Sequence, residues 1–531
     1  MPRPSWPSSW GPGHDPGQPV AGAEVTITHV ESGTVSRTTT DATGRYNARG
    51  LRVGGPYTIV VTKAGEGTDT ESNVYLGLDQ VATVNATLQP DGATTLESVV
   101  VVGQADNTFS SENRGMGTSI SRAELDRTPS PDRSIQDVVR TDPNVVVTDR
   151  DRGAFSAMGQ NFRYNSITVD TIQAGDPFGL NDNGLPTKGT PISQDAIESY
   201  NISTANYDVA TRRGVGAWVN AVTKSGTNDL HGSLYYVYQD ADNMIGKGGT
   251  NRNALTRWNG FEKDTTAGFT LGGPIIKDKL FFFVSYEEGQ KKGLNGLWGA
   301  SDGTKGFKAS GITQANIDAV MATAEAAGLT QPAESTTADM QTKRALVKLD
   351  WNINDFHRAS LRWSQTKEDE PIIVQGNSSR VNLPSNWYGQ DKKSTGATLS
   401  LYDDWSDNFS TELSIGYSKF DQLRGPLFGQ AQPAITVHTD GTSNGPSIVL
   451  GTEYSSQANV LATKSYTAYF AGNWYLGDHV VKAGLDYQQD EFYNLFLQGY
   501  YGSYEFLSPA LFAQAFADLL PGAILTRTRK G

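Results

Sequence analysis

Cysteine, long apolar runs and an excess of positive charge are all missing from this sequence, and each absence excludes a class of protein. The 531-residue chain has no cysteine, so disulfide bridges and thiolate metal sites are both excluded. No run of 18 apolar residues occurs, which excludes a transmembrane helix but not the short, half-polar strands of a membrane barrel. The net charge is -13, which argues against a nucleic-acid partner because such a partner requires basic patches.

Catalytic and metal-binding patterns are equally scarce. None of the six histidines stands in an HxxE or HExxH zinc pattern, and no phosphate-binding P-loop occurs. Residues 441–445 fit the hydrolase pattern GxSxG, but they lie in a predicted loop rather than a strand–turn–helix elbow. We therefore predict that the chain is not an enzyme and has no catalytic residue, cofactor or metal.

The residues that are present indicate a mainly β protein. Glycine is abundant, with 57 residues, and aromatic residues make up 10% of the chain, as expected for many strands and turns. From His231 onward, paired segments alternate apolar and polar residues with a period of two, for example over residues 344–351 and 358–363. A charge on a lipid-facing side costs about 2–4 kcal/mol at the bilayer midplane, so the charged side of each strand is expected to face a lumen.

The connections between these paired segments are unequal in length. Short turns are predicted near residues 354–355, 406–408 and 477–479, and long connections over residues 287–341, 366–394 and 421–464. Such asymmetry is typical of barrels with short periplasmic turns and long extracellular loops. One long connection contains a predicted helix at residues 310–328, whose apolar face is formed by Ile317, Val320, Met321 and Ala324.

The N-terminal part reads as separate small units. Residues 1–17 are rich in Pro, Gly and Ser and are predicted to be disordered. Residues 18–90 predict a β-sandwich with strands at 25–28, 57–61 and 81–88. Residues 91–106 form a linker with four consecutive valines, which favour an extended segment. Residues 107–225 predict a mixed domain with a helix after Ser134 and a strand at 145–147.

Two motifs carry a resemblance to a known family. The sequence NAVTKSGTN at residues 220–228, followed by HG at 231–232, resembles the plug-to-barrel junction of TonB-dependent outer-membrane receptors. LGGPIIKDKLFFF at residues 271–283 is a second match, and residues 19–23 with 40–46 resemble a carboxypeptidase-regulatory-like domain. The chain is most similar to the Oar-like branch, which carries that domain at its N-terminus. One departure is Met158-Gly159, where the family usually has an Arg-Gly pair.

The resemblance implies three domains with distinct roles. Residues 18–90 would be a periplasmic β-sandwich, 107–225 a plug, and 226–531 the first half of a transmembrane β-barrel with long extracellular loops. The segment between sandwich and plug resembles a TonB box, which pairs as an added strand with the energising protein. Its residues are Leu96, Glu97, Ser98, Val99, Val100, Val101 and Val102. The alternative is a last sandwich strand or a plug strand, but the position of the segment between sandwich and plug favours the box.

The implied function is energy-coupled uptake or export of a bulky ligand through the outer membrane of a Gram-negative cell. The implied partners are a TonB-type energising protein, outer-membrane lipid and an unidentified ligand, which could be a peptide, protein, glycan or siderophore. The alternative is a carbohydrate-binding or adhesive surface protein, which has no reason to carry a box and plug. The sequence assigns no ligand-binding residue, and Asp170, Asp176 and Glu198 are expected to make loop hydrogen bonds in solvated turns.

The ends of the sequence give a further expectation. The first residues lack the apolar core of a signal peptide, and only nine or ten strands are predicted against about 22 in a plugged barrel. We therefore expect a receptor fragment that lacks its signal peptide and second barrel half. Its sheet should be open and curved around the plug, with edges near residues 230–238 and 500–506.

Overall fold

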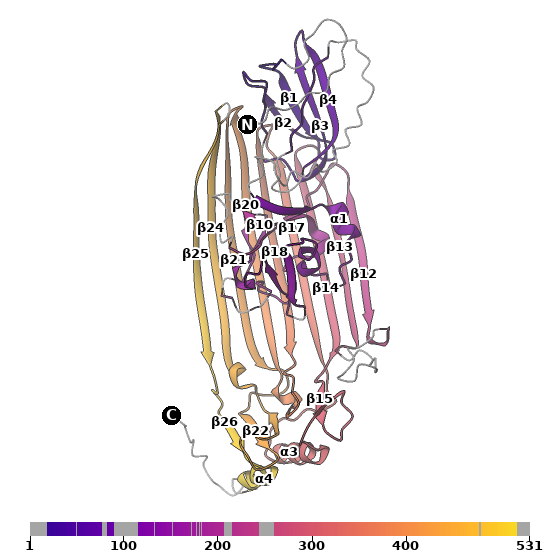
Figure 1. The fold of residues 1–531 in the computed structure, drawn as a ribbon, viewed down its shortest axis with the longest axis vertical. Helices are drawn as coiled ribbons and strands as arrows, with labels where there is room; N and C mark the ends of the chain where they lie inside the picture. The colour runs from indigo at the N-terminus through magenta and orange to yellow at the C-terminus, as the bar shows by residue number, and fades with distance from the viewer. Residues whose placement is uncertain are drawn as a thin grey trace.

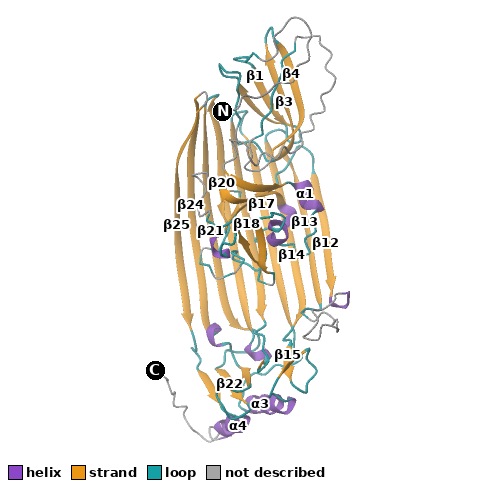
Figure 2. Ribbon diagram, in the orientation of Figure 1, coloured by secondary structure: helices purple, strands orange, loops and turns teal. Residues whose placement is uncertain are grey.

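The computed structural model describes residues 18–48, 50–76, 82–89, 115–131, 133–150, 152–170, 172–176, 178–179, 181, 183–206, 215–243, 260–476 and 479–517. Three bodies follow one another along the chain: a small N-terminal sheet, a mixed domain, and a large antiparallel sheet that curves behind it (Figure 1). Strands dominate all three, while the helices are short and lie in the mixed domain and at the loop end (Figure 2). Within the described part of the chain, no helix has the length and apolar character to cross a bilayer.

The N-terminal sheet contains four strands in the order β2-β1-β3-β4, which are Glu24–His29 (β1), Thr34–Thr39 (β2), Gly54–Lys63 (β3) and Gly67–Leu76 (β4). One face is apolar because Val25 and Ile27 alternate with polar neighbours and pack against Ile59 and Val61 on β3. A turn follows β2, in which the backbone N–H of Thr43 donates to Asp41 Oδ1 at 2.7 Å.

The predicted strand at residues 81–88 is wrong. The described residues 82–88 pair with no neighbouring strand, and only Gln89 forms an isolated bridge, with Thr68. The alternation has another cause: Val84, Ala86 and Leu88 still pack on the apolar face of the sheet. The segment therefore covers the core as an irregular second layer, so the described part of the domain is sandwich-like with one regular sheet.

The mixed domain, called the plug below, occupies the described residues 115–223. Its central sheet has the order β5-β10-β11-β8-β9, with β11 and β8 parallel and the other neighbours antiparallel. The strands are Gly115–Ile120 (β5), Ser166–Val169 (β8), Ile172–Gln173 (β9), Ile197–Asn206 (β10) and Trp218–Thr223 (β11), with the hairpin Val145–Asp149 (β6) and Ala154–Ala157 (β7) beside them.

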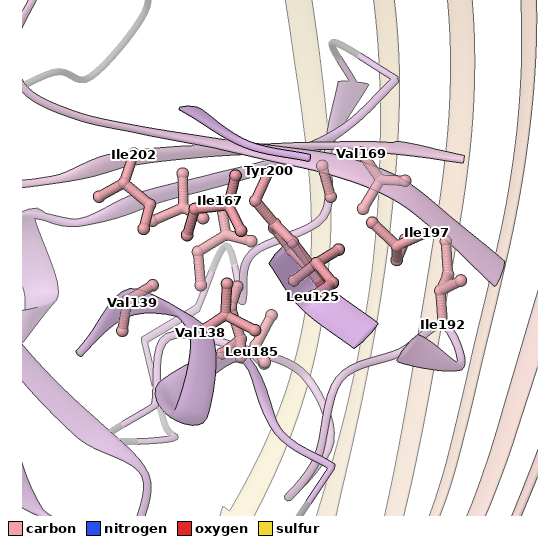
Figure 3. Packing of buried hydrophobic residues seen from close by; sticks show 14 of the residues in the cluster. Leu125, Val138, Val139, Ile167, Val169, Leu185, Ile192, Ile197, Tyr200 and Ile202 are labelled. Carbon is pink, nitrogen blue, oxygen red and sulfur yellow. The ribbon is translucent and has the colours of Figure 1, made fainter. Parts of the chain in front are cut away.

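In the described part of the plug, the α-helices are Arg122–Arg127 (α1) and Ile135–Val139 (α2). Helix α2 follows Ser134 as predicted, and its apolar residues point into the plug core with Leu125 of α1 and Tyr200 of β10 (Figure 3). The same cluster includes Phe283 and Leu346 from the large sheet. The plug core therefore continues onto the wall behind it, which fixes where the plug sits.

Within the described residues, the large sheet, called the barrel sheet below, has nine strands, each hydrogen-bonded antiparallel to the next along the chain. They are His231–Asp240 (β12), Lys263–Ile276 (β13), Leu280–Leu294 (β14), Ala338–Asn352 (β17), His357–Ile372 (β18), Tyr388–Ser406 (β20), Phe409–Pro426 (β21), Ala458–Leu476 (β24) and His479–Leu497 (β25). Among the described residues, β12 and β25 do not pair with each other, so the sheet is open as expected.

Two details of the prediction are corrected by the strand bounds. The strands run further toward the long connections than expected, so that β18 continues to Ile372 and β21 to Pro426. The last edge is β25, whereas Ser503–Phe506 (β26) belongs to a different sheet. The strand ends were predicted too early because these segments contain charged residues. A strand that faces a polar lumen can carry charged residues on its inward side and still alternate.

The long connections pack together into a cap at the end of the barrel sheet opposite the N-terminal domain (Figure 1). The predicted helix forms as Gln314–Ala326 (α3) and buries Ile317, Val320 and Ala324. The capping box of Thr313 and Asn316 explains where it begins. The other cap elements are Trp298–Ala300 (β15), Phe307–Ala309 (β16), Arg380–Asn382 (β19), Ala434–His438 (β22), Ser447–Leu450 (β23), β26 and Pro509–Ala517 (α4).

Candidate functional site

The candidate site is the interface between the plug and the lumen-facing side of the barrel sheet. The inward side chains of β14, β17, β18 and β20 are charged and buried, among them Glu287, Lys348, Arg362 and Glu368. Burying a charge is costly unless it is paired and hydrogen-bonded. Each of these charges contacts the plug directly or through one neighbour, and three clusters result.

The first cluster surrounds Glu287 of β14, which is 2% exposed. Its Oε1 accepts a hydrogen bond from Arg344 Nη1 at 2.7 Å. Its Oε2 accepts from Arg133 Nη2 at 2.9 Å, from Ser193 Oγ at 2.8 Å and from Tyr235 OH at 2.9 Å. Since Arg133 and Ser193 belong to the plug, one barrel carboxylate holds two separate plug segments.

The arginines of this cluster are themselves fixed by further contacts. The guanidinium of Arg133 lies over the Tyr235 ring at 4.7 Å and also pairs with Asp195. The Nε of Arg344 donates to the backbone carbonyl of Thr190 at 2.7 Å. A planar guanidinium held from two sides keeps its orientation, so the cluster acts as a clamp on the plug segment around residues 188–195.

The second cluster surrounds Asp170 and corrects the expectation of a solvated turn. Asp170 follows β8, accepts two hydrogen bonds from Thr223 at 2.8 Å each, and pairs with Arg362 Nη1 of β18 at 3.0 Å. Burial alone would raise the pKa of the Asp170 carboxyl, but Lys348 and Arg362 hold it below its usual value. Lys348 Nζ also donates to the Thr223 carbonyl at 3.1 Å.

The third cluster joins a plug loop to β18 and β20. Lys392 Nζ lies 3.2 Å from Glu368 Oε1 and 2.5 Å from Glu370 Oε2. Lys188 of the plug contributes its backbone N–H to Glu368 at 2.9 Å and its ammonium to Glu370 at 3.4 Å. The plug is therefore held at one edge by a backbone contact as well as by a charge.

The remaining carboxylates named from the sequence have smaller roles. Asp176 accepts hydrogen bonds from the backbone N–H of Phe178 and Asn181, as expected for a loop. Glu198 on β10 is half-buried rather than solvated, and burial raises the pKa of its carboxyl. Residues 441–445 lie in an exposed turn of the cap. Within the described ranges, no three His, Cys, Asp or Glu side chains are grouped as a metal ion would require.

The N-terminal domain docks on the short turns of the barrel sheet. Arg37 Nε donates to Asp355 at 3.0 Å, and Asn352 Nδ2 donates to Thr34 Oγ1 at 2.8 Å. Arg52 Nη1 donates to the carbonyl of Gly226 in the predicted junction at 2.9 Å. A cavity of about 200 Å³ lies between the two bodies. These hydrogen bonds are polar contacts of the kind found at interfaces between domains of one chain.

The predicted box, Leu96 to Val102, lies outside the described residues, as do the linker 91–106, residues 1–17 and the plug residues 207–209. The site residues that sequence reasoning missed are Arg133, Glu287 and Arg344. The alternation did place Arg344 on the lumen side, but nothing in a single sequence showed which plug residue would face it.

Comparison with protein families decides the class of the molecule. The family model described as "Outer membrane beta barrel domain" matches residues 222–296 and 306–530, which is more than half of the chain. The chain belongs to this family. A second model, the carboxypeptidase regulatory-like domain, matches residues 14–89 and so covers the N-terminal sheet.

Two kinds of relative extend this assignment. The TonB-dependent transporter Oar of Myxococcus xanthus is 29% identical over 283 residues, which cover 51% of this chain and 25% of Oar. The chain is thus an Oar homologue that spans about a quarter of the length of that relative.

Among solved structures, a mutant of the ferric enterobactin receptor of Pseudomonas aeruginosa is 14% identical, with 71% of this chain and 49% of that one covered and a TM-score of 0.46. The siderophore receptor PirA of Acinetobacter baumannii is 16% identical, with coverages of 71% and 48% and a TM-score of 0.45. The chain spans about half the length of these receptors.

Proposed function

We propose that this outer membrane β-barrel protein is an energy-coupled transporter whose plug is moved to let a bulky ligand pass, either inward or outward. The observation that carries the proposal is the Glu287 cluster, which links Arg133 and Ser193 of the plug to Arg344 of the barrel sheet. If the plug never moved, an apolar interface with the barrel sheet would hold it in place as firmly as these ion pairs do. Replacing a buried ion pair by well-packed apolar residues is often neutral or stabilising, so a polar interface favours movement over permanence.

The order of the domains indicates where along the chain the energising protein would pull. The proposed division is a periplasmic domain at 18–90, a linker with the box at 91–106, a plug at 107–225 and the barrel from 226. The plug ends in β11, and Arg52 of the docked N-terminal domain reaches the junction at Gly226. A strand added at the box by a TonB-type protein would therefore pull on the chain between the docked domain and the first plug strand.

The proposed ligand is taken to be bulky because the long connections fold into a cap with its own apolar core at the end of the barrel sheet. The chemical class of the ligand, whether peptide, protein, glycan or siderophore, is left to binding experiments. The N-terminal domain is expected to remain folded by itself in the periplasm. A circular dichroism spectrum of residues 18–90 should show strands, and a helical spectrum would contradict this expectation.

The box is tested by Val100→Pro, which removes a backbone donor and should block strand addition. The purified periplasmic domain of a TonB-type protein is titrated with the chain, and binding is expected to be lost. Ala93→Pro in the linker is the matched control and should bind as the unchanged chain does. Equal binding by both variants would show that the box lies elsewhere.

A further inference from the structure

The cavity between the N-terminal domain and the short turns of the barrel sheet has no part in the functions proposed above. It measures about 200 Å³ and lies with the N-terminal domain at the end of the barrel sheet opposite the cap (Figure 1). The N-terminal domain lines it with residues 36–38 of β2 and with residues 47–48, and the barrel sheet lines it mainly with residues 356–357 and 404–407. A molecule bound there would therefore touch both bodies at once.

The sequence of β2 makes one wall of this cavity polar. The register pairs Thr38 with Val25 and Ser36 with Ile27, so these hydroxyls point to the same side of the sheet as the apolar core residues of β1. Thr34 has the same parity, and all three hydroxyl residues are buried. Because β2 is the edge strand, its hydroxyls form a polar border where the apolar core ends.

Two of the buried hydroxyls that line the cavity lack a hydrogen-bond partner. Within the described part of the chain, neither Thr38 Oγ1 of β2 nor Ser410 Oγ of β21 has one, and each residue is 6% exposed. Thr34 differs, because its Oγ1 bonds to Ser32 Oγ at 2.6 Å and accepts from Asn352. A buried hydroxyl without a partner is costly, so the two groups are expected to bond to a molecule inside the cavity.

The size of the cavity indicates what kind of molecule it can hold. A single water needs about 10–15 Å³ of such space, and the cavity of about 200 Å³ offers more than ten times that volume. A protein cavity of about 150 Å³ admits benzene. The space between the two bodies is therefore large enough for one six-membered ring.

An aromatic ring is held in place beside the two hydroxyls. Trp405 lines the cavity, its Nε1 donates to Thr411 Oγ1 at 2.8 Å, and its ring lies 5.1 Å from the ring of His357. Although both contacts fix the indole, the residue remains 60% exposed. A fixed and uncovered aromatic ring offers dispersion contacts to the C–H groups of a ligand.

The ionisable side chains that line the cavity already have partners that do not line it. The pairs are Arg37 with Glu24 and Asp355, His357 with Asp403, Asp404 with Arg358, and Asp407 with Thr39. The cationic Arg37 is thus neutralised from two sides, which disfavours an anion as the ligand. The described residues also contain no group of three carboxylate or histidine side chains that a metal ion would require. An uncharged ligand fits this lining best.

We propose that the cavity binds one uncharged pyranose ring of a saccharide, with its hydroxyls on Thr38 and Ser410 and its C–H groups against Trp405. A sugar hydroxyl both donates and accepts, as the two unpartnered side-chain hydroxyls do. An apolar ring of the same size would leave them unsatisfied. Since the saccharide contacts both bodies, it binds the docked arrangement and stabilises it by mass action.

The test uses the chain in a detergent without a sugar headgroup, titrated with methyl β-D-glucopyranoside or N-acetylglucosamine and followed by saturation-transfer NMR. A ligand of this size should bind with a Kd of about 1 mM. Thr38→Val with Ser410→Ala removes both hydroxyls and should weaken binding about 25-fold, since one neutral hydrogen bond contributes about five-fold. Without sugar, this double variant should unfold at no lower temperature than the unchanged chain.

The matched control is Thr70→Val with Ser72→Ala, which removes the same groups from exposed positions on β4 and should leave binding unchanged. Amide exchange in the turns 354–357 and 406–408 should slow when the sugar is added, because the ligand holds the domains together. Cyclohexanol, a ring of similar size with one hydroxyl, should bind more weakly than the sugars, and glucose 6-phosphate should bind no more tightly than the glucoside.

Four results would overturn the proposal. Binding of neither sugar would show that the cavity holds water only. Equal loss in the two double variants would place the sugar elsewhere. Cyclohexanol binding as tightly as the sugars would show an apolar cavity, and tighter binding of glucose 6-phosphate would show an anion site.

Discussion

Glu287→Gln is the substitution that probes the plug–barrel interface most sharply. The carboxylate is 2% exposed and accepts hydrogen bonds from two arginines, a serine and a tyrosine. The amide has nearly the same shape but no charge, and one of its atoms is a donor. Arg133 keeps Asp195 and Arg344 keeps the Thr190 carbonyl, so each arginine loses only part of its pairing.

The expected cost follows from these contacts. Removing one partner of a buried ion pair costs about 3–5 kcal/mol, and the remaining partners place Glu287→Gln at about 3 kcal/mol. That value corresponds to about a hundred-fold change in the equilibrium between seated and released plug segment. The barrel sheet should be unaffected, because its ladder hydrogen bonds do not involve this side chain.

Release of the plug segment can be measured by the labelling of an introduced cysteine, which is specific because the sequence contains no cysteine of its own. Ala196 is fully buried next to the clamped segment, so Ala196→Cys should react with a maleimide only when the plug opens. Adding Glu287→Gln should raise the labelling rate about a hundred-fold. Adding Glu288→Gln, on the outward side of the same strand, is the control and should change it little. Equal rates in the two would refute the clamp.

Two further predictions concern the N-terminal domain. The pKa of His29 is lowered to about 4, mainly by burial and to a smaller extent by Arg52. The unfolded chain therefore binds one more proton than the folded chain between about pH 6.5 and 4. The free energy of unfolding should fall by up to about 3 kcal/mol as the pH drops through that window. The protection factors of the amides in β1 and β2, which correct the exchange rates for the intrinsic effect of pH, should fall between about pH 6.5 and 4.5. Protection factors that do not change with pH would contradict this. Arg37→Glu should weaken docking of the N-terminal domain on the barrel sheet by about 1 kcal/mol, measured as faster amide hydrogen exchange in the turn at Asp355. Asp355→Arg should restore docking in this variant. Arg45→Glu alone is the control and should have no effect.

The sequence predicted the parts of the fold that follow from local rules. Alternation identified the barrel strands and their outward faces, since Val347 and Trp351 face out while Lys348 and Asn352 face in. The short turns were identified from polar residues such as Asn354 and Asp355. The helix α3 followed from the spacing of its apolar residues. In each of these cases the signal lies within a few residues of the element that it predicts.

The failures concern contacts between distant segments. Asp170 was expected to be solvated because its neighbours indicate a turn, but Arg362 lies on a strand 192 positions away. Residues 82–88 alternate as a strand would, yet the sheet beside them offers only one isolated bridge. Pairing between a plug residue and a barrel residue is set by the register of two sheets, which a single sequence does not encode locally.

The central claim is that an energised partner displaces the plug within the barrel sheet. The most direct measurement is maleimide labelling of Ala196→Cys in living cells that make the receptor, with and without an uncoupler of the proton gradient. The account predicts faster labelling in energised cells, with a return to the basal rate after uncoupling or after Val100→Pro. Labelling at one rate in all three conditions would contradict it.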